Sequence, residues 1–420
     1  MTPGVNPATR LPRVVDLAVS AWLLFWASLL VVYNHAGAYA YAGLVILLGA
    51  AGWLVLVRRT PLRGRALLMG MAWSFLLLWM LASQGWAPPS GEGTVWRLAG
   101  QLALMLSLPA LIATRGDGAR SALSHILMAT GIAGAAVMVA DVASGYGLSF
   151  AIDPPDSREI ADLWRRQSDT EMHVGRGLVA WSVLAPTLLA LMATRLHGWR
   201  RGAAGLAFIG LVVVAAWLNR LMIPLLVLAA SLPVFALALK APTLTGRLSV
   251  ALASLSILAA PVVGVLARLV PENALARLPL SWDHRLRMWD YALARTLERP
   301  LTGHGLDASR AMQESFTTRI GVDIPYISLH PHNVGLQVWM ELGAVGAAFA
   351  AGAVGVTALA ALRVARKSPY RMAATCALIV GASVAAMVTV GAWQYWWWGL
   401  VALAGALIAL VPDDAASTPT

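Results

Sequence analysis

Long apolar runs separated by short polar connections occupy most of the chain. About twelve of these runs approach the roughly 20 residues that an α-helix needs to cross the hydrocarbon core of a bilayer. They lie at about 14–33, 36–57, 66–87, 98–113, 121–142, 176–194, 202–219, 221–239, 248–270, 333–362, 370–391 and 394–411. The pattern predicts an all-α polytopic membrane protein, with residues 1–420 forming a single integral membrane domain in a lipid bilayer.

Basic residues gather in every second connection between the runs. They are Arg10, Arg13, Arg58, Arg59, Arg63, Arg65, Arg115, Arg120, Arg195, Arg200, Arg201, Lys240, Arg247, Arg363, Arg366, Lys367 and Arg371. Because Lys and Arg in short loops stay on the cytoplasmic side, these loops and both termini are predicted to be cytoplasmic. The first run is expected to be an uncleaved anchor, since its removal would invert every later loop.

Composition agrees with a membrane protein and narrows the chemistry. Of the 420 residues, 59% are hydrophobic and 12% are charged, far from the average of a soluble domain. The net charge of +11 comes mostly from the cytoplasmic loops, so no nucleic-acid partner is expected. Cys376 is the single cysteine and lies in a predicted span, which excludes disulfides and thiolate metal sites.

The first of two long outer connections comprises residues 143–175. It contains SREIADLWRRQSD, in which Ile160, Leu163 and Trp164 share one helical face. Long ordered connections often contain functional residues. The segment is equally compatible with an amphipathic helix at the membrane interface and with a lid that has no chemical role.

The second long outer connection comprises residues 271–332. It contains a predicted helix at about 284–298, capped by Ser281 or Asp283. The connection has seven Arg and seven Asp or Glu residues, so an anion site in it must be made by particular arginines. Two pairs, each four residues apart, favour stacking of a guanidinium on an aromatic ring: Arg285 with Trp289, and Arg287 with Tyr291.

Two further arginines lie at the outer ends of predicted spans. Asn219 and Arg220 form a tight turn between two apolar runs, and Arg176 begins another run. A charged residue near membrane depth is a functional candidate, but a turn arginine solvated by lipid headgroups is about as common. The sequence leaves both interpretations open for these arginines.

The segment HPHNVGLQVWMELGAVG returns the chain from the second outer connection into the membrane. Asn333, Gln337 and Glu341 recur every four residues and predict a polar stripe on one helix face. For Glu341 the spacing favours a structural hydrogen-bonding role. Just outside the membrane, His332 is a candidate base because a neutral imidazole accepts a proton near physiological pH. Gly343 and Gly346 predict close helix packing below the stripe.

Arginines and a histidine at the outer ends of membrane spans are well suited to one class of substrate. Arginine forks bind and neutralise a diphosphate, while a histidine deprotonates an attacking hydroxyl. A lipid-linked sugar diphosphate would place its chain in the bilayer and its head at this surface.

The motifs around these residues resemble those of the O-antigen ligase and O-antigen polymerase superfamily. The most specific match is His332-Asn333 followed by Leu336-Gln337, Glu341-x-Gly343 and Gly346. A second match is Arg285-x-x-x-Trp289 followed by Arg299-Pro300-Leu301 and Gly303-x-Gly305, and a weaker third is Asn219-Arg220. Arg176 departs from the pattern, since many relatives have another polar residue there.

The resemblance implies a membrane glycosyltransferase of the C-like kind with a large periplasmic loop. It would transfer O-antigen from undecaprenyl diphosphate to a sugar hydroxyl of lipid A-core, at the periplasmic face of the inner membrane, with inversion and without metal or cofactor. It implies that His332 activates the acceptor hydroxyl. The diphosphate would be bound by Arg176, Arg220, Arg285 and Arg287, with Asn219, Trp289, Asn333, Gln337 and Glu341 in support.

Three alternatives remain open on the sequence. The nearest is an O-antigen polymerase of the same superfamily, whose acceptor is another lipid-linked repeat, and the next is a protein O-oligosaccharyltransferase. The third, from another class, is a polytopic transporter, whose polar residues would line a pathway across the membrane. The candidates cluster on the outer side, which favours the transferases.

Overall fold

The computed structural model describes residues 65–88, 116–152 and 163–413, together with positions 52–53, 95, 100, 107–108 and 112. The predicted spans at 14–33, 36–57 and 98–113 lie almost wholly outside these residues. So do the side chains of the predicted amphipathic segment between residues 157 and 169.

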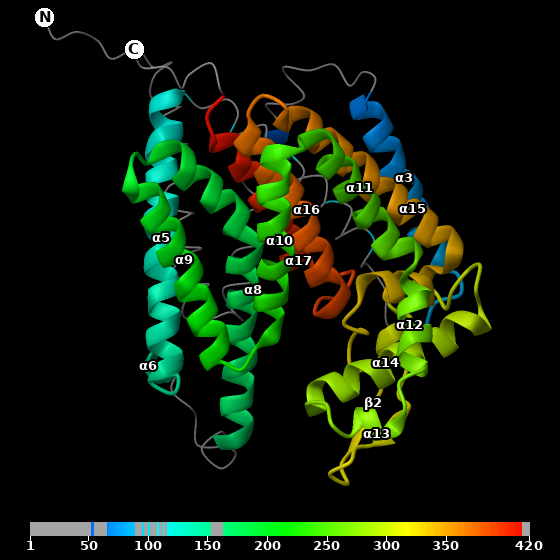
Figure 1. The fold of residues 1–420 in the computed structure, drawn as a ribbon. Coiled ribbons are helices and arrows are strands. Elements are labelled where there is room, and N and C mark those ends of the chain that lie inside the picture. The colour runs from blue at the N-terminus through cyan, green and yellow to red at the C-terminus, as the bar shows by residue number, and fades with distance from the viewer. Residues whose placement is uncertain are drawn as a thin grey trace, which may run out of the picture.

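Helices make up most of the described chain (Figure 1). They are α3 (Arg65–Ser83), α5 (Asp117–Ala143), α6 (Gly147–Ile152), α8 (Leu163–Arg195), α9 (Trp199–Leu218), α10 (Met222–Lys240), α11 (Pro242–Leu258), α12 (Ala260–Arg268), α13 (Glu272–Leu275), α14 (Leu280–Glu298), α15 (Val334–Ala365), α16 (Pro369–Val388) and α17 (Tyr395–Leu407). Six are long and apolar enough to cross a membrane, or seven if α11 and α12, bent by 60°, form one broken span. The described part is therefore that of a predominantly helical membrane protein.

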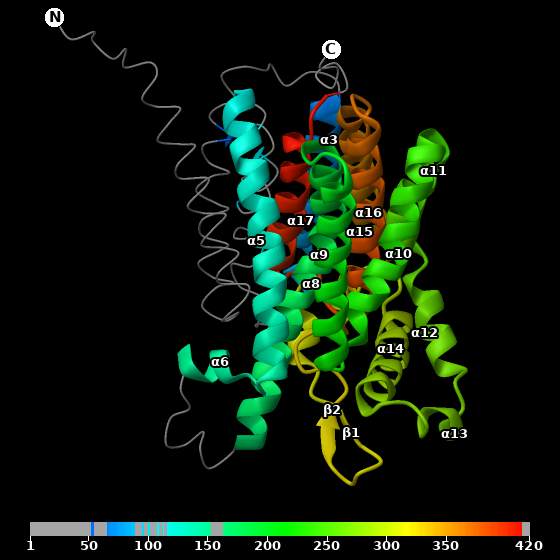
Figure 2. The ribbon, with the colours of Figure 1, turned by 60° about the vertical axis from the view of Figure 1, so that its left-hand side comes forward.

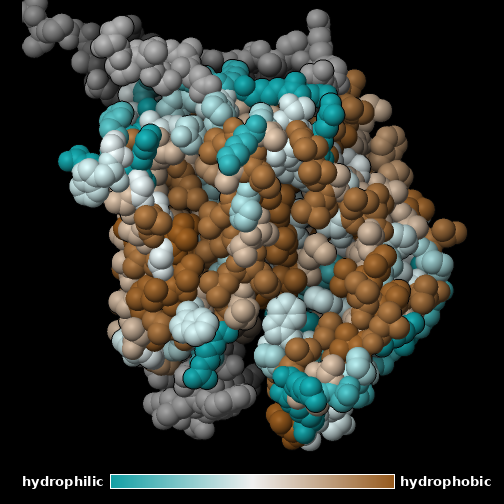
Figure 3. Space-filling model, in the orientation of Figure 1, coloured by the Kyte–Doolittle hydropathy of each residue, from teal (hydrophilic) through white to brown (hydrophobic). Residues whose placement is uncertain are grey.

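Helix α8 lies at the centre of the bundle, and α9 lies at its outside. Trp181 and Leu188 of α8 are completely buried. On α9, by contrast, Trp199, Leu206 and Trp217 are 79%, 77% and 73% exposed. On the face shown in Figure 3, apolar residues form a broad band across the middle of the molecule. Such a band is expected for a surface in contact with lipid rather than water.

Three arginines that the sequence assigns to the same side of the membrane meet at one end of the bundle. Arg120 donates to the carbonyl of Ala409, Arg195 to that of Leu410 at 3.0 Å, and Arg371 to that of Val411 at 2.7 Å. The acceptors are the last carbonyls of the C-terminal helical segment, which have no partners within it. This end lies opposite α14 (Figure 1).

The second outer connection forms a small layer at the other end of the molecule (Figure 2). It contains α13, α14, the 3₁₀ turn η3 (Ala308–Ala311) and an antiparallel hairpin of β1 (Ser315–Thr317) and β2 (Asp323–Pro325). The sequence did not predict the hairpin. Helix α14 ends at Glu298 as expected but begins at Leu280, and neither Ser281 nor Asp283 caps it. Asp283 instead accepts a hydrogen bond from Arg287.

Helix α15 is interrupted at Gly343, where the sequence predicted a continuous helix. Gly343 has φ 66°, and a Cβ there would lie 2.2 Å from the Leu301 carbonyl oxygen. The peptide N–H groups of His304 and Gly305 donate to the carbonyls of Met340 and Glu341 at 2.9 and 2.7 Å. Gly343 therefore admits a loop backbone, not a neighbouring helix. Gly346 does face a helix, since its Cβ would lie 3.1 Å from Trp79 of α3.

Candidate functional site

His332 lies immediately before α15, in a backbone conformation that few residues other than glycine adopt. Its φ is 51°. Asn333 follows as the N-cap of α15, and its side-chain oxygen accepts the Leu336 N–H at 2.9 Å, as the sequence predicted. On the other side, Trp289 of α14 donates its indole N–H to the Pro331 carbonyl at 3.0 Å. Both neighbours of His332 are thus tied to the scaffold.

Within the described chain, one nitrogen of the His332 ring has a hydrogen-bond partner and the other has none. Nδ1 lies 2.8 Å from the Thr389 carbonyl oxygen, which can only accept, so Nδ1 carries the proton. Burial lowers the pKa of His332 to about 4, and the positive charge of Arg285 acts in the same direction. The ring is therefore neutral at physiological pH, and its Nε2 presents a lone pair.

His330 forms a pair with His332, which the sequence analysis did not anticipate. Their ring centroids are 4.6 Å apart, and Nδ1 of His330 accepts the peptide N–H of His332 at 3.2 Å. Burial lowers the pKa of His330 to about 3. Its other nitrogen lies 2.9 Å from the side-chain amide of Gln394. Neutral His330 can therefore hold the left-handed backbone of His332 in place.

Arg285 is the arginine with the largest effect on His332. Its Nε donates to the Val388 carbonyl at 3.1 Å, and its Nη1 donates to the Ser281 carbonyl at 2.8 Å. Its guanidinium stacks on Trp282 at 5.6 Å, not on Trp289 as the spacing suggested. Among the described residues no carboxylate pairs with it, and burial lowers its pKa. Arg285 thus presents a partly desolvated positive charge without a counter-ion.

Arg287 stands in a different environment, although it is only two residues away. It forms ion pairs with Glu272 at 2.5 Å and Asp283 at 2.9 Å, and these contacts raise its pKa. Its guanidinium also stacks on Phe316 at 5.5 Å, while Tyr291 stacks with Arg295 instead. The charge of Arg287 is already compensated within the protein.

The other two predicted arginines lie on the bundle across from α14. The positive charge of Arg176 in α8 lowers the pKa of both His330 and His332. Arg220 is exposed in the turn between α9 and α10 with φ 52°, and no contact joins it to the histidines within the described chain. Asn219 fixes this turn by accepting the Tyr146 hydroxyl at 2.5 Å and donating to the Glu171 carbonyl. The charges of Arg176 and Arg285 thus act on both histidines, whereas Arg220 lies exposed in its turn.

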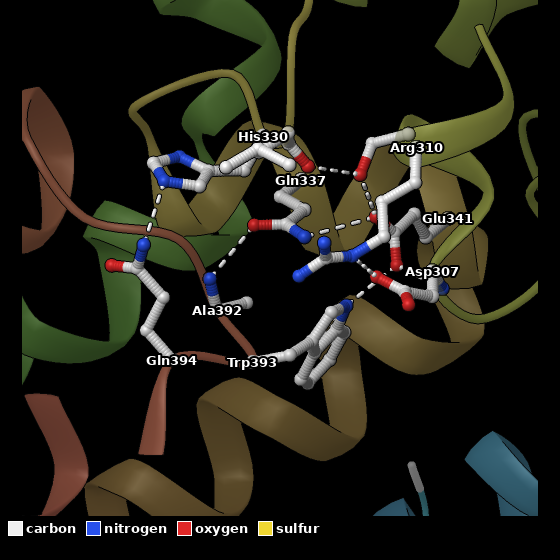
Figure 4. Close-up of polar contacts among 10 residues, drawn as sticks. Asp307, Arg310, His330, Gln337, Glu341, Ala392, Trp393 and Gln394 are labelled. Carbon is white, nitrogen blue, oxygen red and sulfur yellow. Dashed lines mark hydrogen bonds and ion pairs between the residues drawn. The ribbon is translucent and has the colours of Figure 1, made fainter. Parts of the chain in front are cut away.

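The polar stripe of α15 is present and joins three separate segments (Figure 4). Gln337 donates to Glu341 at 2.9 Å and accepts the Ala392 N–H at 2.7 Å. Both carboxylate oxygens of Glu341 accept two hydrogen bonds, from Gln337 and Ser309 at Oε1, and from the Asp307 N–H and Trp393 at Oε2. Glu341 is completely buried. The predicted structural role of these two residues is consistent with this network.

Part of this chain is similar in sequence to a known protein family and to several known proteins. Residues 182–351 match the O-antigen ligase family. A protein of Rickettsia prowazekii named "Putative polysaccharide ligase RP358" is 30% identical over 129 residues, which are 30% of this chain and 31% of that protein. Its counterpart in Rickettsia conorii is 36% identical over 78 residues, or 18% of this chain and 19% of that protein. The chain thus matches about a third or less of the length of these relatives. The resemblance to the O-antigen ligases is confirmed.

The region that matches the O-antigen ligases includes Arg220, Arg285, His332 and Glu341, but not Arg176. Sequence reasoning missed three residues near the histidines: Thr389, Gln394 and Arg310. The first two lie beyond a later helix, and no local pattern connects them with His332. Arg310 was one of seven arginines in its connection, and only the fold distinguishes it from the others.

Proposed function

We propose that this protein is a glycosyltransferase that transfers O-antigen polysaccharide from undecaprenyl diphosphate to a sugar hydroxyl of lipid A-core. The match to the O-antigen ligases supports the class of reaction. One observation carries the assignment of the site. Within the described chain, Nε2 of His332 has no hydrogen-bond partner, and Arg285, whose positive charge acts on His332, has no carboxylate partner.

In the proposed reaction, Nε2 of His332 takes the proton of the acceptor hydroxyl. The hydroxyl oxygen then attacks the anomeric carbon of the donor sugar, forming the new glycosidic bond. The bond from that carbon to the diphosphate breaks, and undecaprenyl diphosphate leaves with the electron pair. Attack opposite the leaving group inverts the anomeric configuration. The Nδ1–H bond to Thr389 stabilises the imidazolium that forms, because the carbonyl dipole points at the new charge.

In this proposal the arginines bind the diphosphate leaving group. Among the described residues Arg285 offers a guanidinium without a carboxylate partner, and the positive charge of Arg176 acts on the same two histidines, His330 and His332. Preorganised cations of this kind stabilise charge that develops on the departing diphosphate. The exposed position of Arg220 suits an earlier contact with the diphosphate. The ion pairs of Arg287 give it a supporting role in positioning α14.

The proposal places the site at the periplasmic face of the inner membrane, with both termini in the cytoplasm. The site lies beside α14, at the end of the molecule opposite the C-terminal end of the helical bundle (Figure 1). Arg120, Arg195 and Arg371 donate to the carbonyls of that C-terminal end. Loops rich in Lys and Arg remain in the cytoplasm, which supports the periplasmic placement of the site. At that face the polyprenyl tail of the donor would lie in the bilayer beside the site.

A deletion strain tests the acceptor. Free lipid-linked polymer together with an unmodified core is the expected phenotype. A core that carries a single repeat would contradict the ligase and assign a polymerase. Purified protein should also form the glycan-core product from donor and acceptor lipids in detergent, where no compartments exist. Failure to form product there, with a transport defect in vesicles, would overturn the transferase.

A further inference from the structure

Arg310 is held in place by a chain of contacts that begins in the membrane helix α15. Glu341 accepts the peptide N–H of Asp307 at 2.6 Å, and Asp307 accepts the Nε–H of Arg310 at 2.8 Å. Between them, Ser309 donates to Glu341 at 2.7 Å and is completely buried. Figure 4 shows the guanidinium of Arg310 extending past Asp307 toward the side on which His330 lies.

The backbone of this segment is as constrained as its side chains. Asp307 has φ 62° and is 6% exposed. A left-handed conformation at a residue other than glycine persists only where the surroundings enforce it, and here the bond to Glu341 does so. Arg310 is therefore presented by a fixed loop, unlike a mobile surface arginine.

The outer end of Arg310 remains available. The side chain is 47% exposed, and its bond to Asp307 uses only Nε. Within the described part of the chain, Nη1 and Nη2 make no hydrogen bond. Their four N–H groups thus remain available to a ligand, on the side of the close-up where His330 lies (Figure 4).

The contrast between the two arginines indicates different ligands. Within the described part of the chain, Arg285 bonds to backbone carbonyls and to no carboxylate, so its charge is free to bind a phosphate. The charge of Arg310 is balanced by Asp307, so attraction to a second anion would be opposed by that carboxylate. Its remaining N–H groups suit neutral oxygen acceptors. In a transferase that acts on glycans, such acceptors are sugar hydroxyls.

We propose that Arg310 is a glycan-binding residue, whose terminal N–H groups bind hydroxyls of the sugar that lies beside the histidine pair. The inference rests on the proposed function, because it takes the ligand to be a substrate sugar. That sugar belongs either to the donor glycan or to the acceptor core. If Arg310 binds the glycan, Glu341 also has a role beyond packing, because it positions the loop that presents Arg310.

The test uses purified full-length protein with Arg310→Ala and Arg310→Lys. Loss of the hydrogen bonds from Arg310 to the sugar should raise KM for one substrate roughly tenfold or more, with a smaller change in kcat. A rise in the donor KM assigns the donor sugar, and a rise in the acceptor KM assigns the acceptor sugar. Arg277→Ala, which removes an exposed arginine of the same connection, is the matched control and should change neither KM.

Salt distinguishes a sugar from an anion. Contacts to hydroxyls are not screened, so the effect of Arg310→Ala should be the same at roughly 50 and 500 mM NaCl. An effect that disappears at high salt would mean that Arg310 binds an anionic group and would overturn the inference. Equal KM values for wild type and Arg310→Ala would overturn it as well.

A binding measurement separates this inference from the proposed function. Donor and acceptor lipids are each added to wild type and to Arg310→Ala, and the shift of the unfolding temperature gives the affinity. Tighter binding of a lipid by the wild type than by the variant supports the inference, even if no transfer is observed. Absence of transfer alone would contradict only the proposed function. Equal shifts in the two proteins would refute the role of Arg310.

Discussion

The indole N–H of Trp289 in α14 donates to the carbonyl of Pro331, 3.0 Å away and one residue before His332. The residue at position 332 has a strained φ of 51° and cannot be held there by local preference. Trp289 thus connects the outer helix directly to the candidate base. This relationship leads to the first of five predictions.

Trp289→Phe keeps most of the buried ring but removes the hydrogen bond. A hydrogen bond contributes about 1 kcal/mol net. If this contribution positions His332 for the reaction, its loss should lower kcat roughly three- to tenfold. Transfer by purified enzyme measures kcat. Trp199→Phe, on the exposed face of α9, is the control. An unchanged kcat would mean that the Pro331 carbonyl needs no such support.

His332→Ala should abolish transfer while the level of membrane-inserted protein stays the same. Loss of a general base reduces rates by about 10² to 10⁴. His125→Ala is a suitable control, because Nδ1 of His125 also contacts a backbone carbonyl, at 2.8 Å, but the residue is exposed on α5. The readout is the laddering of lipopolysaccharide in cells. Normal laddering in the His332 variant would remove this residue from the chemistry.

The pH dependence follows from the lowered pKa of His332, about 4 against an ordinary 6.5. Because the base stays unprotonated well below pH 6.5, kcat/KM should remain level from pH 8 to near pH 5. Between the two pKa values the unfolded chain binds more protons than the folded one, so stability should fall as pH is lowered from about 6.5 toward 4. A rate profile that breaks near pH 6.5 would show that the ring is solvated.

Arg285→Lys retains the positive charge but loses the planar fork. The bond from Nε to Val388 disappears, and a lysine cannot hold two carbonyls and a diphosphate in the same geometry. We expect kcat/KM to fall by roughly tenfold or more, which is about 1.4 kcal/mol of transition-state binding. Arg277→Lys is the control. Full activity of the Arg285 variant would reduce its role to that of a point charge.

Gly343→Ala should destabilise the protein. The new Cβ would lie 2.2 Å from the Leu301 carbonyl oxygen, on a residue with φ 66°, so both contact and conformation oppose it. Overlap of this kind costs about 1–3 kcal/mol or more. The yield and unfolding temperature in detergent measure the effect. Gly352→Ala in the same helix has nothing within 4 Å of its Cβ and should behave as wild type.

Several parts of the site could be predicted because they depend on residues near one another in the chain. Asn333 as an N-cap and the Gln337 to Glu341 bond follow from helix geometry alone. The end of α14 at Glu298 followed from the Pro and Gly residues after it. The motif around His332 resembled the family whose model matches residues 182–351.

Other parts could not be predicted, because residues distant in sequence decide them. The stacking partner of Arg285 is Trp282 and not Trp289, since Trp289 is turned inward to Pro331. The break at Gly343 exists because residues 300–305 insert their backbone there. His330 became a partner of His332 only through the turn that both share.

The sequence by itself determined a helical membrane protein and a short set of candidate residues, because hydrophobic runs, basic loops and helix spacing are local properties of the chain. Only the tertiary structure decided which charges are compensated. Arg285, Arg287 and Arg310 are the same residue type in one connection. Among the residues that the structure describes, however, Arg285 has no carboxylate partner, Arg287 has two and Arg310 has one. Electrostatic compensation depends on distances between folded segments, and spacing along the chain does not specify those distances.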